Sequence, residues 1–212
     1  NRSRSLRIVW LLEELNIPYE IKNYIRGADG LAPKELLDVH PLGKSPVISD
    51  GDRVIAESGV IVDYLIKKYG NGKFLPTEEN YLDNEYWNHF SEGTLMSAVV
   101  MKVIFTKIPA QVPFFIRPLA NMICSGFDAG YVKPNVDRSV AFSEDTLKKR
   151  GDGWIAGGDK DGNPTAADFM MVFPLQAGVG LGVVPEDSAI KAYIARATGR
   201  DAYKRAVERG GV

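Results

Sequence analysis

The 212-residue sequence predicts an α+β unit over residues 1–72, a linker over residues 73–79 and an all-helical region over residues 80–212. In the first unit, apolar residues switch between the three-to-four spacing of a helix and the alternation of a strand. Gly and Pro cluster where this unit ends, in the stretch GNGKFLP at residues 70–76, which is typical of a connection between units. Beyond residue 79 no segment alternates like a strand, so we expect only helices there.

Helices and strands alternate through the first unit. Its first helix has Leu6, Trp10 and Leu15 at the spacing of one buried face. The order α-β-α-β-β-α needs one more strand before Ser5 to complete a βαβ unit, so we expect residues upstream of Asn1. The predicted elements are a helix over residues 5–16, a strand over 19–24, a helix over 33–38, strands over 46–49 and 53–56, and a helix over 58–69.

Amphipathic periodicity predicts the helices of the second region. In one of them Val140, Phe142 and Leu147 are expected to face the core. The stretch TAAD at residues 165–168 has the form of a capping box with Asp in the place of the usual Glu or Gln, and we interpret it as structural. The predicted helices span residues 82–97, 99–105, 113–124, 136–150, 165–175 and 188–197.

Charge and cysteine content exclude several classes of protein. With 26 basic and 27 acidic residues the chain has a net charge of −1, so it lacks the basic excess of a nucleic-acid-binding protein. One cysteine, Cys124, excludes a disulfide within the chain and indicates a reducing, cytoplasmic location. It stands among apolar residues, as a buried structural cysteine does. His40 and His89 are far apart, and we expect no metal site.

The most apolar stretch, residues 99–124, is interrupted by Lys102, Lys107, Arg117 and three prolines. We interpret it as a buried or interfacial helix and not as a membrane span, which needs a longer uninterrupted apolar run. Within it, the proline-broken residues 108–118 carry Phe114 and Phe115. This segment is unusual, and a lid, a dimer contact or a contact with a membrane surface are all open at this point.

Charged and polar residues stand at both ends of the predicted hairpin. Pro46 opens a strand, where its missing N–H is tolerated, and an ordinary trans proline is the local expectation. A cis bond would leave the backbone of Ser45 facing outward as an edge for an extended peptide. After the hairpin, Glu57 and Ser58 begin a helix, whose amino end favours anionic groups. A plain helix cap with an acidic neighbour is the alternative.

Taken together, these features resemble the cytosolic glutathione transferase family over nearly the whole chain. The resemblance rests on WLLEEL at residues 10–15, HPLGKSP at residues 40–46, Glu57-Ser58 after the hairpin and the capping box at residues 165–168. Residues 3–12, SRSLRIVWLL, look most like a theta-like subgroup of yeast, fungi and bacteria. The resemblance implies a thioredoxin-like N-terminal domain that binds glutathione, followed by an all-α domain, in a cytoplasmic homodimer.

The resemblance assigns binding roles to the hairpin residues. Lys44 would meet the glycine carboxylate of glutathione, and Ser45, followed by the cis Pro46, would pair its backbone with the cysteinyl part. Glu57 would bind the γ-glutamyl ammonium, and Ser58 would hold the γ-glutamyl carboxylate at its helix end. Glutathione would act as co-substrate, with no metal.

The family activates the thiol with a hydroxyl or a thiol near the start of the first helix. Ser3 is our candidate, with Ser5 and Asn1 as alternatives. An alignment on the Trp10 helix puts the family position near Arg2, and a Tyr upstream of Asn1 is another alternative. Ser3 and Ser5 would otherwise only cap the helix. The neighbouring arginines, Arg2, Arg4 and Arg7, would then contact glutathione carboxylates or the partner subunit.

The family's electrophile pocket lies between the two domains. We expect Tyr86, His89, Phe90 and the segment of residues 96–101 to line it, although helical spacing is equally compatible with a core role. The implied activity is conjugation of glutathione to small hydrophobic electrophiles, as in detoxification, with glutathione peroxidase activity as an addition. The alternative is a non-catalytic protein of the same fold that binds glutathione or a hydrophobic ligand, or that regulates a partner. A contact with a membrane surface has no support beyond the apolar segment.

Overall fold

The computed structural model describes residues 3–25, 27 and 33–210. Its N-terminal part is built around a short antiparallel hairpin. Its register runs from Val47 opposite Ala56 to Asp50 opposite Arg53. Gly51 in the turn has φ 59°, in the left-handed region that favours glycine. The elements of this part are α1 (Ser5–Leu15), α2 (Glu35–Val39), β1 (Val47–Asp50), β2 (Arg53–Ala56) and α3 (Ser58–Tyr69).

The hairpin is attached to α3 through the carboxylate of Asp50. Tyr64 and Tyr69 donate their hydroxyl protons to it over 2.8 and 2.6 Å, and the Lys68 ammonium donates over 2.8 Å. Hydrogen bonds from Lys68, Tyr69 and Tyr64 lower the pKa of Asp50 to about 2. The three donors are spaced along one helix so that they reach the end of one strand, and this orients the hairpin relative to α3.

The prediction of a strand over residues 19–24 is wrong. The structure assigns neither helix nor strand to residues 17–25, although Tyr19 donates its hydroxyl proton to Glu13. A strand needs a neighbour that satisfies its backbone N–H and C=O groups, and in the described part of the chain β1 and β2 pair only with each other. The alternation of apolar and polar residues therefore predicted a strand, but the described residues include no neighbouring strand with which it could pair.

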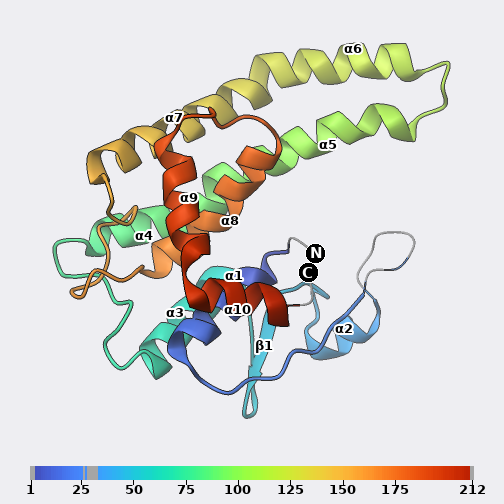
Figure 1. Ribbon diagram of the computed structural model, residues 1–212. Helices are drawn as coiled ribbons and strands as arrows, with labels where there is room; N and C mark the ends of the chain where they lie inside the picture. Colours follow the sequence, from blue (N-terminus) through green and yellow to red (C-terminus); the bar gives the residue numbers. More distant parts are fainter. Residues whose placement is uncertain (1–2, 26, 28–32, 211–212) are drawn as a thin grey trace.

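The remaining described chain is mostly helical, as predicted (Figure 1), and most of its helices are longer than the sequence indicated, although the helix predicted over residues 113–124 begins only at Arg117. The separately predicted helices over residues 82–97 and 99–105 form one continuous run that ends at Gln111. The final helix was not predicted, because its buried residues include only small alanines and one tyrosine. The elements are α4 (Tyr81–Phe90), the π-helix η1 (Ser91–Met96), α5 (Ser97–Gln111), α6 (Arg117–Phe127), the π-helix η2 (Asp128–Val132), α7 (Lys133–Arg150), α8 (Ala166–Gly180), α9 (Ala189–Gly199) and α10 (Asp201–Arg209).

Helix α8 lies at the centre of the core and contacts both parts of the chain. The predicted capping box is present: Thr165 and Asp168 exchange hydrogen bonds at its start. Asp168 is fully buried, and it also accepts hydrogen bonds from Ile155 N–H and the Tyr193 hydroxyl. Burial raises the pKa of Asp168, although these bonds oppose the rise. The box is structural, as predicted.

Helix α1 joins the N-terminal part to the helices. Its Trp10 ring packs on Phe169 of α8 with ring centroids 4.5 Å apart, and edge-on against Tyr203 of α10. Outside this contact, Glu13 accepts a hydrogen bond from Arg205 over 2.7 Å. Helix α1 therefore packs between α8 and α10, and the N-terminal part and the helical part of the chain share one apolar core.

Candidate functional site

A polar cavity of about 550 Å³ lies at the entrance of the hairpin. Segments around the starts of α1, β1 and α3 form its wall. All five residues predicted as glutathione contacts, Lys44, Ser45, Pro46, Glu57 and Ser58, lie in this wall. The other lining residues are Arg4, Tyr24, Leu36, His40, Leu42, Gly43, Ala56 and Glu92.

Ser45 stands at the edge of the hairpin. The Ser45–Pro46 peptide bond is cis, and pairing with β2 begins one residue later, at Val47 opposite Ala56. Ser45 therefore precedes the paired part of the strand, where an extended peptide can align beside it. Its hydroxyl oxygen lies 2.8 Å from that of Ser5, so the hairpin entrance touches the first turn of α1.

Glu57 has an unusual backbone conformation, with φ 70° and ψ 120°. Residues other than Gly are strained there by about 1–3 kcal/mol, and such strain concentrates at ligand sites. The next residue, Ser58, is only 6% exposed and begins α3. The same wall therefore presents a carboxylate, which attracts a cation, and a helix amino end, which attracts an anion.

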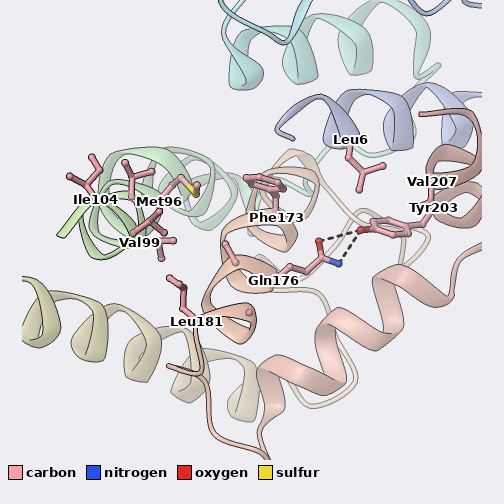
Figure 2. Close-up of a pocket in the computed structure, with 13 residues that line it drawn as sticks. Leu6, Met96, Val99, Ile104, Phe173, Gln176, Leu181, Tyr203 and Val207 are labelled. Atoms are coloured by element: carbon pink, nitrogen blue, oxygen red, sulfur yellow. Dashed lines mark hydrogen bonds between the residues drawn. The ribbon is translucent and has the colours of Figure 1, made fainter. Parts of the chain in front are cut away.

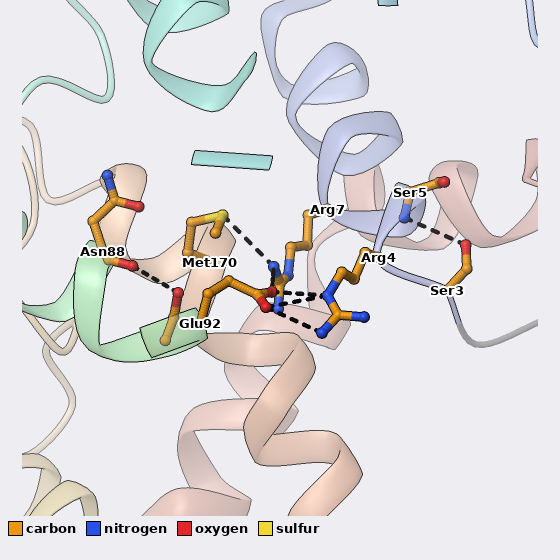
Figure 3. A network of polar contacts seen from close by, with 8 residues as sticks. Ser3, Arg4, Ser5, Arg7, Asn88, Glu92 and Met170 are labelled. Atoms are coloured by element: carbon orange, nitrogen blue, oxygen red, sulfur yellow. Dashed lines mark hydrogen bonds and ion pairs between the residues drawn. The ribbon is translucent and has the colours of Figure 1, made fainter. Parts of the chain in front are cut away.

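Arg4, just before α1, and Arg7 of α1 converge on Glu92 at the cavity wall (Figure 3). Arg4 donates to both carboxylate oxygens of Glu92 over 3.0 and 3.1 Å, and Arg7 donates to one of them. The Arg7 side chain is 1% exposed, lies 4.9 Å over the ring of Phe173, and has two nitrogens, Nε and Nη2, without a hydrogen-bond partner. A buried guanidinium of this kind depends on its one carboxylate.

The pKa values of Arg7 and Glu92 are both lowered, but for different reasons. Burial lowers the pKa of Arg7 to about 10, although Glu92 acts to raise it. Burial acts to raise the pKa of Glu92, but hydrogen bonds and charges from Arg4 and Arg7 outweigh it and lower that pKa. At neutral pH Arg7 and Glu92 are therefore both charged, and the hydrogen bonds from Arg4 to Glu92 fix the position of Arg4 at the cavity wall.

The candidates for thiol activation occupy different positions. Ser3 is exposed, and its hydroxyl accepts a hydrogen bond from the backbone N–H of Ser5 over 3.3 Å, which is the capping role that was the alternative. Ser5 instead points its hydroxyl at Ser45, beside the polar cavity. The third candidate, Asn1, and Arg2 lie outside the described residues.

A second cavity, of about 720 Å³, is apolar and lies between α1, α5, α8 and α10 (Figure 2). One hydrogen-bonded pair interrupts its apolar wall: Gln176 donates its amide N–H to the hydroxyl oxygen of Tyr203 over 3.0 Å. The lining residues are Leu6, Met96, Val99, Val100, Val103, Ile104, Phe173, Gln176, Ala177, Gly180, Leu181, Tyr203 and Val207. Residues 96–101 were expected to line a pocket, and three of them, Met96, Val99 and Val100, line this cavity.

The other residues predicted for that pocket lie elsewhere, and Tyr86, His89 and Phe90 line neither cavity. Tyr86 is 49% exposed and stacks on Phe90 with ring centroids 5.8 Å apart. Both rings contact Phe142, which was expected to face the core but is 45% exposed. Their side of α4 faces α7, whereas the cavity lining on this helical run begins at Met96, the last residue of η1.

Sequence reasoning missed several cavity residues. Tyr24, His40 and Glu92 were not considered for the polar cavity, and nothing in the sequence near Glu92 indicates that it pairs with arginines 85 and 88 positions earlier. Phe173 lay inside the helix predicted over residues 165–175 and Gln176 one residue beyond it, and neither was considered for a cavity. The sequence contained one signal for this network. Arg4 and Arg7 are both basic and lie three residues apart, about one helical turn, so they can share one acidic partner.

Comparisons with known proteins show the family of this chain. The family model for the glutathione S-transferase N-terminal domain matches residues 2–68. Glutathione S-transferase 1 of Saccharomyces cerevisiae is 31% identical, over 99% of this chain and 92% of its own. Glutathione S-transferase 3 of Schizosaccharomyces pombe is 36% identical, over 82% of this chain and 70% of its own.

Solved structures with the same fold cover the whole chain. A glutathione S-transferase of Actinobacillus pleuropneumoniae superposes with a TM-score of 0.77 at 32% identity, over 99% of this chain and 89% of that one. A glutathione transferase of Phanerochaete chrysosporium, solved with oxidized glutathione, superposes with a TM-score of 0.72 at 21% identity, over 98% of this chain and 90% of that one. These matches confirm the thioredoxin-like N-terminal part followed by helices.

Proposed function

The chain belongs to the glutathione transferase family, and on that premise we propose that it joins the sulfur of glutathione to small hydrophobic electrophiles. The observation that carries the proposal is the adjacency of two unlike cavities. Arg4, the residue before α1, lines the polar cavity, and Leu6, in the first turn of α1, lines the apolar one. A charged peptide suits the first cavity and an apolar reactant suits the second, so their reacting atoms would meet at the start of α1.

The polar cavity offers a complementary group for each charged end of glutathione. In the proposed mode, Lys44 binds the glycine carboxylate, Glu57 binds the γ-glutamyl ammonium, and the amino end of α3 at Ser58 binds the γ-glutamyl carboxylate. Charge-assisted hydrogen bonds of this kind contribute about 1.5–3 kcal/mol each. The backbone of Ser45 pairs with the cysteinyl residue, which brings the thiol towards α1.

We assign stabilisation of the thiolate to Ser5 in preference to Ser3. A free thiol has a pKa of about 8.5 and is mostly protonated at neutral pH. A hydroxyl that donates a hydrogen bond to the sulfur lowers that pKa, as does the amino end of a helix. Two contacts support the choice: the Ser5 hydroxyl lies 2.8 Å from that of Ser45, whereas the Ser3 hydroxyl already accepts a bond from the Ser5 N–H.

The chemical step then follows from a bound thiolate. The thiol proton leaves to solvent, the sulfur forms a bond to an electrophilic carbon, and a leaving group departs with the electron pair of its bond. An electrophile in the apolar cavity is held by Leu6, Phe173 and their neighbours, away from bulk water. With a hydroperoxide as substrate, two glutathione molecules would be oxidised to the disulfide while the peroxide is reduced to an alcohol and water.

A homodimer in the cytoplasm is part of the proposal. Leu82, Tyr86 and Phe142 are 75%, 49% and 45% exposed, and they form an apolar face on α4 and α7 that a second subunit would cover. The single cysteine suits a reducing compartment.

Titration with glutathione tests the proposal. We would follow the heat of binding and the ultraviolet absorbance of the thiolate across pH, for the protein and for the variants Ser5→Ala and Ser3→Ala. We expect the thiol pKa to fall on binding, Ser5→Ala to raise it again, and Ser3→Ala to leave it nearly unchanged. Binding with an unshifted thiol would instead favour the non-catalytic binding protein, and no binding at millimolar glutathione would overturn the proposal.

A further inference from the structure

The hairpin of α5 and α6 projects beyond the rest of the molecule (Figure 1). Helix α6 packs against α5 and runs into η2, so its outer surface has no covering element among the described residues. The two helices meet at a loop around Val112, which lies at the far end of the projection from the N-terminal part. The loop end is therefore a convex tip, which can touch a planar surface without interference from the body of the protein.

The tip is apolar and exposed. Phe114 and Phe115 are 78% and 70% exposed, and the outer face of α6 adds Leu119, Met122 and Ile123, each more than half exposed. Isolated apolar residues on a surface are ordinary, but a contiguous group of this size marks a binding surface. Of the interpretations left open for residues 108–118, a lid does not fit, because none of them lines either cavity.

The charge around the tip has one sign. Between Glu92 and Asp128 the sequence contains no acidic residue but has Lys102, Lys107 and Arg117. Lys102 is neutralised by Asp128 at 2.6 Å, whereas no ion pair is found for the exposed Lys107 or Arg117 in the described structure. The two cations flank the phenylalanines, as in membrane-surface helices that place basic residues at the level of lipid headgroups.

We propose that this tip, defined by Phe114, Phe115, Leu119, Met122 and Ile123, docks on the surface of an anionic lipid bilayer. The apolar side chains enter the boundary between headgroups and acyl chains, while Lys107 and Arg117 contact anionic headgroups. A second copy of the chain fits less well, because two tips brought together would place four cations side by side with no acidic residue nearby to compensate them.

The helical run Tyr81–Gln111 favours a contact with the membrane surface and not a transmembrane helix. By length and composition, Tyr81–Gln111 is apolar enough to cross a membrane: an 18-residue window has a mean hydropathy of 1.3, and 22% of it is buried. However, its earlier part packs into the protein core through Trp87 and Leu95, so that part is not accessible to lipid. Ile104 on α5 lines the apolar cavity and is also 48% exposed. Docking would thus bring the cavity near a reservoir of apolar compounds.

Co-sedimentation with lipid vesicles tests the docking. The probes are vesicles of phosphatidylcholine alone and vesicles that also contain phosphatidylserine, with the full chain and the double variant Phe114→Ser/Phe115→Ser. We expect binding to the anionic vesicles that weakens with added salt, and a loss of at least about tenfold in partitioning in the double variant, since each phenyl ring removed from water shifts an equilibrium by roughly this factor. Lys107→Gln/Arg117→Gln should weaken binding to anionic vesicles only.

A matched control is Val54→Ser, which changes an exposed apolar residue of β2 at the opposite end of the molecule (Figure 1) and should leave binding unchanged. All variants should keep the circular dichroism spectrum of the parent, because the changed side chains are exposed. The proposal is overturned if neither kind of vesicle binds, or if the phenylalanine variant binds like the parent. Self-association that disappears in that variant, without vesicle binding, would assign the tip to a second copy and overturn it as well.

Discussion

The two cavities at the start of α1 differ in chemistry and in how the chain builds them. The polar cavity takes most of its wall from residues 36–58, a nearly continuous stretch, and its chemistry comes from charged side chains, a strand edge and a helix end. The apolar cavity takes its wall from four helices that are far apart in sequence, and one hydrogen bond within its wall joins Gln176 to Tyr203. The first can recognise one defined ligand, and the second accepts any apolar molecule of suitable size.

This difference explains how the two sites can vary independently. A site made by one short segment depends on a few charge-assisted contacts, so single substitutions should change its affinity strongly. A site made by the packing of helices depends on volume, so substitutions should change which reactant fits, with smaller effects. The salt-bridge network of Arg4, Arg7 and Glu92 touches both sites: Arg4 and Glu92 line the polar cavity, and Arg7 lies over the ring of Phe173, which lines the apolar one.

Removing Glu92 should have the largest effect. Glu92→Ala leaves the buried Arg7 guanidinium unpaired, which should lower the free energy of unfolding by about 2–3 kcal/mol; partial exposure of the carboxylate keeps the value at the lower end. Both glutathione affinity and turnover of the electrophile should fall. Denaturant titration measures the stability. Arg7→Met combined with Glu92→Ala should recover part of it, and no recovery would mean that the carboxylate matters for another reason.

Glu57→Gln should affect one cavity only. Loss of the charge that faces the γ-glutamyl ammonium should weaken glutathione binding by about tenfold to a hundredfold, as expected for a charge-assisted hydrogen bond. Because the residue is exposed, the free energy of unfolding should change little. Calorimetric titration gives the affinity. Asp52→Asn, an exposed acidic residue of the hairpin turn outside the cavity wall, is the matched control, and an equal loss there would contradict the assignment.

Ala177→Leu should affect the other cavity. Its side chain borders the apolar cavity, and three added carbons should raise KM for a bulky electrophile by up to about tenfold while glutathione affinity stays the same. Steady-state kinetics with a small and a large electrophile separate the two effects. Ala141→Leu, on the exposed face of α7, serves as the control. An equal KM for both electrophiles would place the reaction outside this cavity.

The ion pairs of Glu92 should also affect how stability depends on pH, and this is the smallest effect that we expect. The pKa of Glu92 is lower in the folded protein than its usual value of 4.5, so its stabilising contribution is complete above about pH 4.5 and is lost as the pH falls through the folded value. Glu92→Gln should therefore flatten the loss of stability in this acidic range, as measured by thermal unfolding at a series of pH values. An unchanged slope would show that other carboxylates control acid unfolding.

Local chemistry predicted the hairpin turn, a polar helix start at Glu57 and Ser58, and the capping box of Thr165 and Asp168, because each depends on neighbours within a few positions. The binding roles, including that of Lys44, came from the resemblance to the family, and the local expectation of a trans Pro46 was wrong. The structure brings Lys44, Ser45, Glu57 and Ser58 into one wall and confirms the box. The strand over residues 19–24 failed for the complementary reason, because a strand is decided by a partner elsewhere in the chain.

By itself, the sequence determined the helical periods, the hairpin, the capping box before α8 and the family to which the chain belongs, because these are set by residues close together along the chain. Only the tertiary structure decided that Glu92 neutralises Arg4 and Arg7, that Phe173 and Tyr203 line the apolar cavity while Tyr86 and Phe90 do not, and that the α5–α6 tip is left uncovered by the described residues. Each of these depends on which faces of distant helices meet, and helical periodicity identifies an apolar face without saying what packs against it.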